Sequence, residues 1–306
     1  MRYKPFAALA LAAALCTARS PAHAGAVVWV SATGSDTNTC HPADPCATFD
    51  HAISTTMGAS EVECVTPGNF ANTGLNIISP VTINCPGGVV VGGISVGTSS
   101  GVVILRGIEI QGLGAGADGL DLNGGALVLD NVKINGFSGA GLSINASATV
   151  SVTNSQFSNN SNGIVVEPTS GTGLVSLSHV DVENNFNGIL IGTGTPSSGE
   201  SAVTLIDSVV ANNAGTGINV TGGGAGQFLE IKHSSIVSNN SDGLFVNGSG
   251  AFALIGDSVV AWNGAGIASV GGGNIYSYRN NQINGNDRIN HSGVDISGSV
   301  NTLGLQ

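Results

Sequence analysis

Apolar and polar side chains alternate along most of this chain, in stretches of only a few residues. Between residues 101 and 273 one pattern occurs seven times: an alternation, a polar turn, a second alternation, an Asn-rich corner, a Gly and a third alternation. A two-residue period places apolar side chains on one face of a β-strand, and no part of this block has a helical period. Each repeat is therefore predicted to hold three short strands. Their third strands carry the pairs Leu120/Leu122, Leu142/Ile144, Ile164/Val166, Ile189/Ile191, Ile218/Val220 and Leu244/Val246.

The spacing of the repeats predicts a solenoid. A landmark Gly recurs every 22 to 29 residues, at Gly119, Gly141, Gly163, Gly188, Gly217, Gly243 and Gly266. One repeat cannot bury its own apolar face, whereas parallel strands stacked about 4.8 Å apart bury a continuous core. We therefore predict an all-β protein, a right-handed parallel β-helix of about eight coils.

Polar residues recur at two corners of each repeat. Before the third strand stand Asn159/Asn160, Asn184/Asn185, Asn212/Asn213, Asn239/Asn240 and Asn263. Between the first and second strands stand Asp130, Asn154, His179, Asp207, His233 and Asp257. Asn tolerates left-handed backbone, and its amide can bond the same amide one coil away. The two histidines are two coils apart, about 10 Å by strand spacing, which favours turn capping over a shared metal.

The ends of the chain depart from the repeat. Asp44-Pro45 resembles a helix N-cap followed by proline, and a short amphipathic helix is predicted from Cys46 to Met57, across the open end of the coils. We divide the mature chain into a cap with irregular first coils (25–100), regular coils (101–273), and a last partial coil with a C-terminal cap (274–306). No third strand is expected after Asn286.

Residues 1–24 have the features of a signal peptide. Arg2 and Lys4 precede an apolar run from Phe6 to Cys16, and Ala22-His23-Ala24 predicts cleavage after Ala24. The apolar run is too short for a convincing membrane span, and no later stretch is long enough. The sequence thus predicts a secreted or periplasmic bacterial protein.

Four cysteines follow the predicted cleavage site. An even number in an exported chain favours disulfides, and four cysteines allow three connectivities. We favour Cys40–Cys46 and Cys64–Cys85, because the second pair is separated by about one coil and would bring neighbouring strands within bridging distance. A zinc site is the alternative, and the cysteine spacing and the compartment both argue against it.

The mature chain is strongly acidic. It keeps five basic residues against 19 acidic ones, a net charge of −14. Such a surface is a poor partner for nucleic acid, and it repels polyuronates unless cations bridge the two.

The repeat and the N-terminal stretch VVWVSATGSDTNTC…PCATFDHAI resemble exported bacterial proteins of the pectin-lyase-like superfamily of right-handed parallel β-helices. The resemblance covers nearly all of the mature chain. That superfamily includes polysaccharide lyases, glycoside hydrolases, uronan epimerases and phage tailspikes, so the resemblance implies a fold and leaves the activity open. It also implies a monomer, or a trimer if the chain is tailspike-like.

The catalytic signatures of that superfamily are absent here. The chain has no Asn-Thr-Asp, adjacent acidic pair, Gly-His-Gly, Arg-Ile-Lys or Asp-Pro-His-Asp, and its basic residues lack the proline-containing context of the pectate lyases. Gly114 to Leu120 matches part of a calcium-binding nonapeptide repeat once, whereas that motif works in tandem. We predict no cofactor, and calcium has no motif in its support.

The remaining site candidates are polar residues on the outward face of the second strand. Glu109, Lys133, Gln156 and Asp181 are predicted on successive coils, with Asp118 and Asp121 at the next corner. Glycoside hydrolysis needs two carboxylates, and β-elimination needs a base and a group that neutralises the substrate carboxylate. The alternative is a solvated face without chemistry. Phe245 and Trp262 are the aromatic side chains expected to face outward and to be available for stacking on sugars.

Two functions follow. The first is a non-catalytic exported protein with a binding or structural role, whose partner would be a polysaccharide. The second is a lyase or hydrolase of an acidic polysaccharide with a divergent site at Glu109, Lys133, Asp181, Asp118 and Asp121. The small outward side chains and the excess of acids favour the first.

Overall fold

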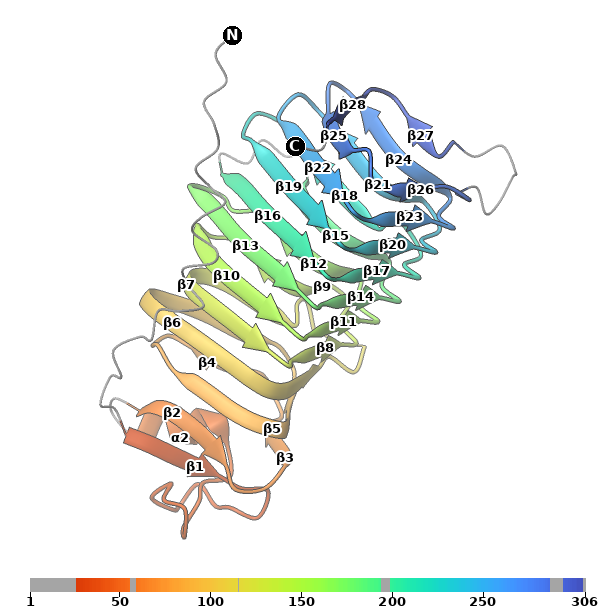
Figure 1. The fold of residues 1–306 in the computed structure, drawn as a ribbon. Helices are drawn as coiled ribbons and strands as arrows, with labels where there is room; N and C mark the ends of the chain where they lie inside the picture. The colour runs from red at the N-terminus through yellow and green to blue at the C-terminus, as the bar shows by residue number, and fades with distance from the viewer. Residues whose placement is uncertain (1–25, 56–58, 115, 194–198, 287–293, 305–306) are drawn as a thin grey trace.

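The computed structural model describes residues 26–55, 59–114, 116–193, 199–286 and 294–304. The predicted signal peptide and Met57 lie outside these residues. The chain winds into a β-solenoid whose stacked strands form three faces, and the strands within each face pair in parallel (Figure 1). No helix in the described ranges is long and apolar enough to cross a membrane.

The strands fall into three columns, in which some long strands bend round a corner and serve two faces. Face 1 contains β1 (Ala26–Val30), β2 (Ala59–Cys64), parts of β5 (Thr82–Val91), β6 (Ile94–Gln111) and β7 (Leu120–Asp130), then β10 (Ala148–Thr153), β13 (Thr172–Ser178), β16 (Glu200–Ile206), β19 (Gln227–Lys232), β22 (Ala251–Gly256), β25 (Asn274–Tyr278) and β28 (Val300–Leu303). Face 2 contains β3 (Gly68–Ala71), parts of β5 and β6, β8 (Lys133–Asn135), β11 (Gln156–Ser158), β14 (Asp181–Glu183), β17 (Val209–Ala211), β20 (Ser235–Val237), β23 (Val259–Ala261) and β26 (Gln282–Ile283). Face 3 contains β4 (Leu75–Ile77), parts of β6 and β7, β9 (Ala140–Ile144), β12 (Asn162–Val166), β15 (Asn187–Thr193), β18 (Ile218–Thr221), β21 (Asp242–Asn247), β24 (Ala265–Val270) and β27 (Ile296–Ser297).

The all-β solenoid is therefore confirmed, but it has about ten coils, from β2–β4 to β25–β27, where eight were predicted. The irregular stretch before residue 101 forms coils without the Asn and Gly landmarks. The prediction that no third strand follows Asn286 was wrong, because β27 pairs with β24. The tail then adds β28 to β25 in face 1, so it extends the stack as a further strand.

The core is the inside of the tube. Along β10 and β13 every second side chain is buried, as the two-residue period predicts, and Phe157, Val182 and Val210 fill successive coils under face 2. These aliphatic and aromatic side chains belong to one buried hydrophobic cluster that runs through the described coils.

A short helix, α2 (Phe49–Thr55), closes the N-terminal end of the tube (Figure 1). Phe49 is fully buried, with its ring centroid 5.0 Å from that of Phe70. The helix begins three residues later than predicted, because Thr48 is its cap: the Thr48 Oγ1 atom accepts a hydrogen bond from the His51 N–H at 3.1 Å. Cys46 instead pairs with the outer edge of β1: its N–H donates to the Trp29 carbonyl oxygen, and its carbonyl oxygen accepts from the Ser31 N–H. This pairing protects that strand edge.

A buried column of asparagines holds the corner between faces 2 and 3. Its members are Asn160, Asn185, Asn213, Asn239, Asn263 and Asn286. The Oδ1 atom of Asn213 accepts hydrogen bonds from both the N–H and the Nδ2 group of Asn185, at 3.0 and 3.2 Å. Asn213 in turn donates from Nδ2 to Asn239 at 2.9 Å, so the predicted amide-to-amide contact is confirmed.

The landmark glycines pack against this asparagine column. A Cβ atom on Gly217 would lie 2.7 Å from both the Asn239 Nδ2 atom and the Gly243 carbonyl oxygen. Gly217 is not among the glycines with positive φ, so close approach of the backbone, and not backbone conformation, requires glycine there.

The corner between faces 1 and 2 is a column of left-handed residues. Asn131, Asn154, His179, Asp207, His233 and Asp257 have φ between 49° and 54°. Asp130, which was predicted to be the first member, is instead the last residue of β7 and pairs with Thr153. The neighbouring Asn131 takes the turn position, which Asn, Asp and His occupy more readily than most residues.

Candidate functional site

A shallow polar depression lies at the corner between faces 1 and 2. Its volume is about 320 Å³. Its lining comes from three successive coils: Asn131, Lys133, Asn154, Ser155, Gln156, His179 and Asp181. All of these side chains offer hydrogen-bonding atoms, and none is apolar, so the depression suits a polar ligand.

The strand register of face 2 agrees with the prediction and determines where the charged residues of the depression lie. Lys133, Gln156 and Asp181 occupy equivalent positions in β8, β11 and β14, and Glu109 in β6 pairs with Lys133. The predicted column of outward polar side chains is therefore confirmed. The next strand, β17, has Val209 opposite Asp181, which ends the run of hydrogen-bonding side chains.

The corner itself supplies the other wall. Asn154 donates from Nδ2 to the Asp130 Oδ1 atom at 3.1 Å, and the His179 Nδ1 atom lies 2.9 Å from the Ser178 Oγ atom. The left-handed backbone turns both side chains outward at the point where face 1 gives way to face 2. The turn thus fixes where these two polar groups stand relative to Lys133 and Asp181.

Lys133 and Asp181 carry the free charges of the depression. Both side chains are exposed, and within the described part of the chain neither makes a hydrogen bond or an ion pair. An ammonium group and a carboxylate without protein partners are available to a ligand, and solvent screens both of them.

The other carboxylates near face 2 are engaged by side-chain amides. Asn135 donates from Nδ2 to Glu109 Oε1 at 2.9 Å, and Gln156 donates from Nε2 to Glu183 Oε1 at 2.8 Å. Glu109 does not line the depression. Glu109 is the strand neighbour of Lys133 one coil away, as predicted, but the two residues do not share the depression.

Asp118 and Asp121 belong to a different corner. The Asp118 Oδ1 atom accepts a hydrogen bond from the Ala140 N–H at 2.6 Å, which ties one coil to the next. Asp121 lies in face 3 and accepts amide hydrogen bonds from Asn123 and Asn145, at 2.7 and 2.6 Å. Neither residue lines the depression, so of the five predicted site residues only Lys133 and Asp181 share it.

The arrangement limits the chemistry of the depression. Hydrolysis of a glycosidic bond uses two carboxyl groups, and Asp181 is the one carboxylate among the lining residues. β-Elimination needs a base and a positive group beside the substrate carboxylate, and His179 and Lys133 could fill those roles. Binding of a hydroxyl-rich ligand needs only the amides and charges that are present.

One charged cluster was not predicted as a unit. His233 lies between two acids of the left-handed column: its Nε2 atom is 2.7 Å from Asp257 Oδ2, and its Nδ1 atom is 3.8 Å from Asp207 Oδ1. All three residues stand in the predicted column, so their adjacency on consecutive coils was the available signal. The cluster joins three coils on the exposed corner.

The exposed aromatic side chains also differ from the prediction. Trp262 is 65% exposed, as expected, whereas Phe245 is only partly exposed. Phe186, which was not considered, is 61% exposed. Trp262 and Phe186 both lie at the corner between faces 2 and 3, on different coils.

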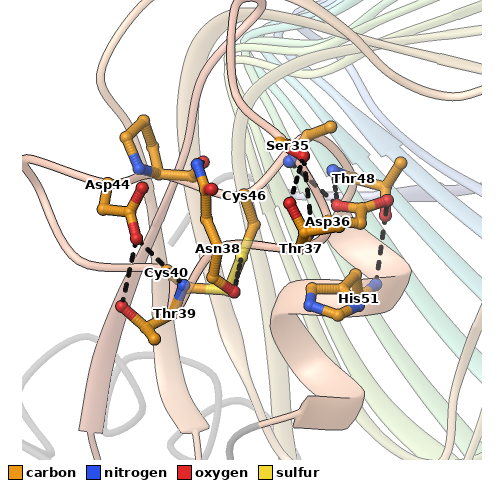
Figure 2. The surroundings of a disulfide bond; sticks show 12 residues. Ser35, Asp36, Thr37, Asn38, Thr39, Cys40, Asp44, Cys46, Thr48 and His51 are labelled. Atoms are coloured by element: carbon orange, nitrogen blue, oxygen red, sulfur yellow. Dashed lines mark hydrogen bonds between the residues drawn. A yellow bond between two sulfur atoms is a disulfide. The ribbon is translucent and has the colours of Figure 1, made fainter.

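The cysteines form the two favoured disulfides, Cys40–Cys46 and Cys64–Cys85. Figure 2 shows the first beside His51, with Asp36 accepting hydrogen bonds from the N–H groups of Ala47 and Thr48 at 2.9 and 3.0 Å. Ligand atoms of Cys40, Cys46 and His51 lie within 4.8 Å of one another. Because a metal is bound by thiolates and both sulfurs are bonded to each other, this cluster is a structural link.

A family model described as "Right handed beta helix region" matches residues 92–259. Among solved structures, the chain is similar to an alginate lyase from Paenibacillus sp. str. FPU-7, with 15% identity, a TM-score of 0.52, and coverage of 90% of this chain and 99% of that one. It is also similar to the pectate lyase Pel9A, with 16% identity, a TM-score of 0.48, and coverage of 90% and 76%. The A-module of the mannuronan C-5 epimerase AlgE6 from Azotobacter vinelandii has 12% identity, a TM-score of 0.38, and coverage of 92% and 90%. No curated protein matches the chain.

Proposed function

Because the chain belongs to the family of right-handed β-helix proteins, we propose that it uses this scaffold as a non-catalytic binding protein for a polysaccharide outside the cytoplasm. The observation that carries the proposal is the depression at the corner between faces 1 and 2, where amides, a free ammonium group and a free carboxylate meet. Such groups donate and accept hydrogen bonds along a chain of sugar hydroxyls. The alginate lyase that shares the fold acts, by its name, on a polysaccharide.

The state of the carboxylates favours binding over catalysis. Glu109 and Glu183 each accept a hydrogen bond from a neighbouring amide, and Asp181 has no second carboxylate beside it in the depression. A glycosidase needs one carboxylic acid and one carboxylate on opposite sides of the scissile bond. The depression supplies contacts for a ligand and lacks that pair.

Export is part of the proposal. Residues 1–24 have the composition of a signal peptide, and two disulfides are typical of secreted or periplasmic proteins. Together these features support export to a compartment where polysaccharides of a cell wall or matrix are found.

Binding of polysaccharides to purified residues 25–306 tests the proposal, with calorimetry as the readout. Lys133→Ala removes the free ammonium group, and the loss of a charged hydrogen bond should weaken binding about tenfold or more. Ser235→Ala is the matched control, because Ser235 faces outward in the same column two coils beyond Asp181. Wild-type protein that is folded and binds no member of a broad panel would refute the proposal.

A polysaccharide lyase is the second candidate, because Lys133, His179 and Asp181 line one depression. The same incubations would then generate unsaturated uronate, visible as ultraviolet absorbance, and Lys133→Ala or His179→Ala would abolish it. New reducing ends without unsaturation would indicate a hydrolase. Either product would replace the binding role by an enzymatic one.

A further inference from the structure

Trp262 occupies a backbone position that is costly for its side chain. It has a φ of 59°. The equivalent residues of the other coils are Gly136, which precedes Phe137, and Asn159, Asn184, Asn212, Ser238 and Gly285, each one before a buried asparagine; all have positive φ. Glycine and asparagine adopt this conformation readily, whereas a bulky side chain there is an outlier that the rest of the structure must stabilise.

Packing does not repay that cost. The indole is 65% exposed, so most of its surface remains in water. The residues in the same column on the neighbouring coils are Ser238 and Gly285, which are too small to cover a ring. A single exposed aromatic needs no explanation by itself, but an exposed aromatic held in a strained conformation marks a functional position.

Among the residues that the structure describes, those exposed beside Trp262 are polar and uncharged. Exposed Asn240, Ser241 and Asn284 lie on the same corner, on the coils on either side of Trp262. Asp242 follows Ser241, and burial raises the pKa of its carboxyl group. Amides and hydroxyls around one ring are suited to a hydroxyl-rich ligand, and a neighbouring carboxylate disfavours an anionic one.

We propose that Trp262 is the stacking platform of a second binding site, separate from the corner depression, which takes a neutral glycan. The apolar C–H face of a pyranose ring lies on the indole, and the sugar hydroxyls bond to Asn240, Ser241 and Asn284. Tryptophan combines a large apolar surface with few rotatable bonds, so it orders a ligand at low entropic cost. The site requires neither Lys133 nor Asp181.

The two tryptophans of the chain make the test direct. In a Trp29→Phe background Trp262 is the one remaining tryptophan, and stacking of a sugar should shift its fluorescence to shorter wavelength. The probes are a series of neutral β-glucan oligosaccharides, with oligogalacturonates as the anionic comparison. A saturable shift with the neutral series, and a much weaker response to the anionic one, is expected.

Trp262→Asn separates binding from stability, because asparagine is the residue most often used at this position of the repeat. Affinity for the β-glucan, measured by calorimetry, should fall at least tenfold, while relief of the strained backbone should raise the melting temperature by about 2 °C. Phe186→Ser, at the other exposed aromatic of this corner, is the matched control and should leave the affinity unchanged. The fluorescence shift of Trp262 reports ligand at this site alone, which distinguishes this site from the depression.

Three results would overturn the proposal. One is the absence of any fluorescence shift with the neutral oligosaccharides while the protein is folded. Another is a fall in the melting temperature of Trp262→Asn, which would make the indole a packing residue. The third is tighter binding of the oligogalacturonates than of the neutral series.

Discussion

The asparagine column makes a quantitative prediction about stability. Asn213 is fully buried, and its Oδ1 atom is the acceptor for the N–H and the Nδ2 group of Asn185. Its Nδ2 group donates to the Val182 carbonyl oxygen at 3.2 Å and to Asn239 at 2.9 Å. Asn213→Ala removes all four hydrogen bonds and leaves the Asn185 N–H inside the protein with no acceptor.

The size of the effect follows from these contacts. An orphaned buried N–H costs about 1 to 3 kcal/mol, and each further hydrogen bond contributes about 0.5 to 1.5 kcal/mol net. Since Asn185 Nδ2 keeps its bonds to Phe157 and Glu183, we expect a total loss of about 4 kcal/mol. Urea denaturation followed by circular dichroism measures it, and hydrogen exchange of the Asn185 amide reports the local change.

The adjacent Asn212 provides the control. It is exposed and has a φ of 56°, so Asn212→Gly should change stability by less than about 0.5 kcal/mol. If Asn213→Ala were as stable as this control, the asparagine column would not be a structural element and the reasoning would fail.

Three further predictions concern other parts of the stack. Gly217→Ala should destabilise the protein by about 1 to 3 kcal/mol, because its Cβ atom would meet the Gly243 carbonyl oxygen, whereas Gly224→Ala, with open space around it, should be neutral in the same urea titration. Ile189→Asp buries an unpaired carboxylate at a cost of several kcal/mol, so it should prevent recovery of protease-resistant protein. The neighbouring Leu190 points outward, so Leu190→Asp should fold. Equal yields of protease-resistant protein from the two variants would refute the strand register. Because burial raises the pKa of the Asp242 carboxyl, the native state holds that proton more tightly, and the stability linked to it is lost as pH rises through the native pKa. Asp242→Asn should therefore be more stable than wild type at pH 7, and the difference should vanish below about pH 3, which melting curves across pH would show.

The sequence alone was sufficient to predict the solenoid, the outward column from Glu109 to Asp181, and both disulfides. A two-residue alternation determines which side chains face the core, and the repeat forces neighbouring coils to share it. Equivalent residues of neighbouring coils are therefore predictable wherever the repeat is regular. The first coils lack the Asn and Gly landmarks, and for that reason the number of coils was underestimated.

The sequence did not determine which residues form the turn and which share the depression. These depend on contacts between coils whose loops differ in length. Hydrogen bonding across strands makes Asn131, and not Asp130, the turn residue, and it brings Lys133 and Asp181 into one depression while Asp118 and Asp121 stay at another corner. Glycine is required at position 217 because an amide and a carbonyl group on the next coil lie against it. The local sequence pattern does not predict those two contacts. The cost of Trp262 likewise appears only when its φ and its exposure are seen together. Local periodicity thus determined the fold of this chain, and the packing of coil on coil determined its sites, because a side chain's partners here lie some 23 to 31 residues away along the sequence.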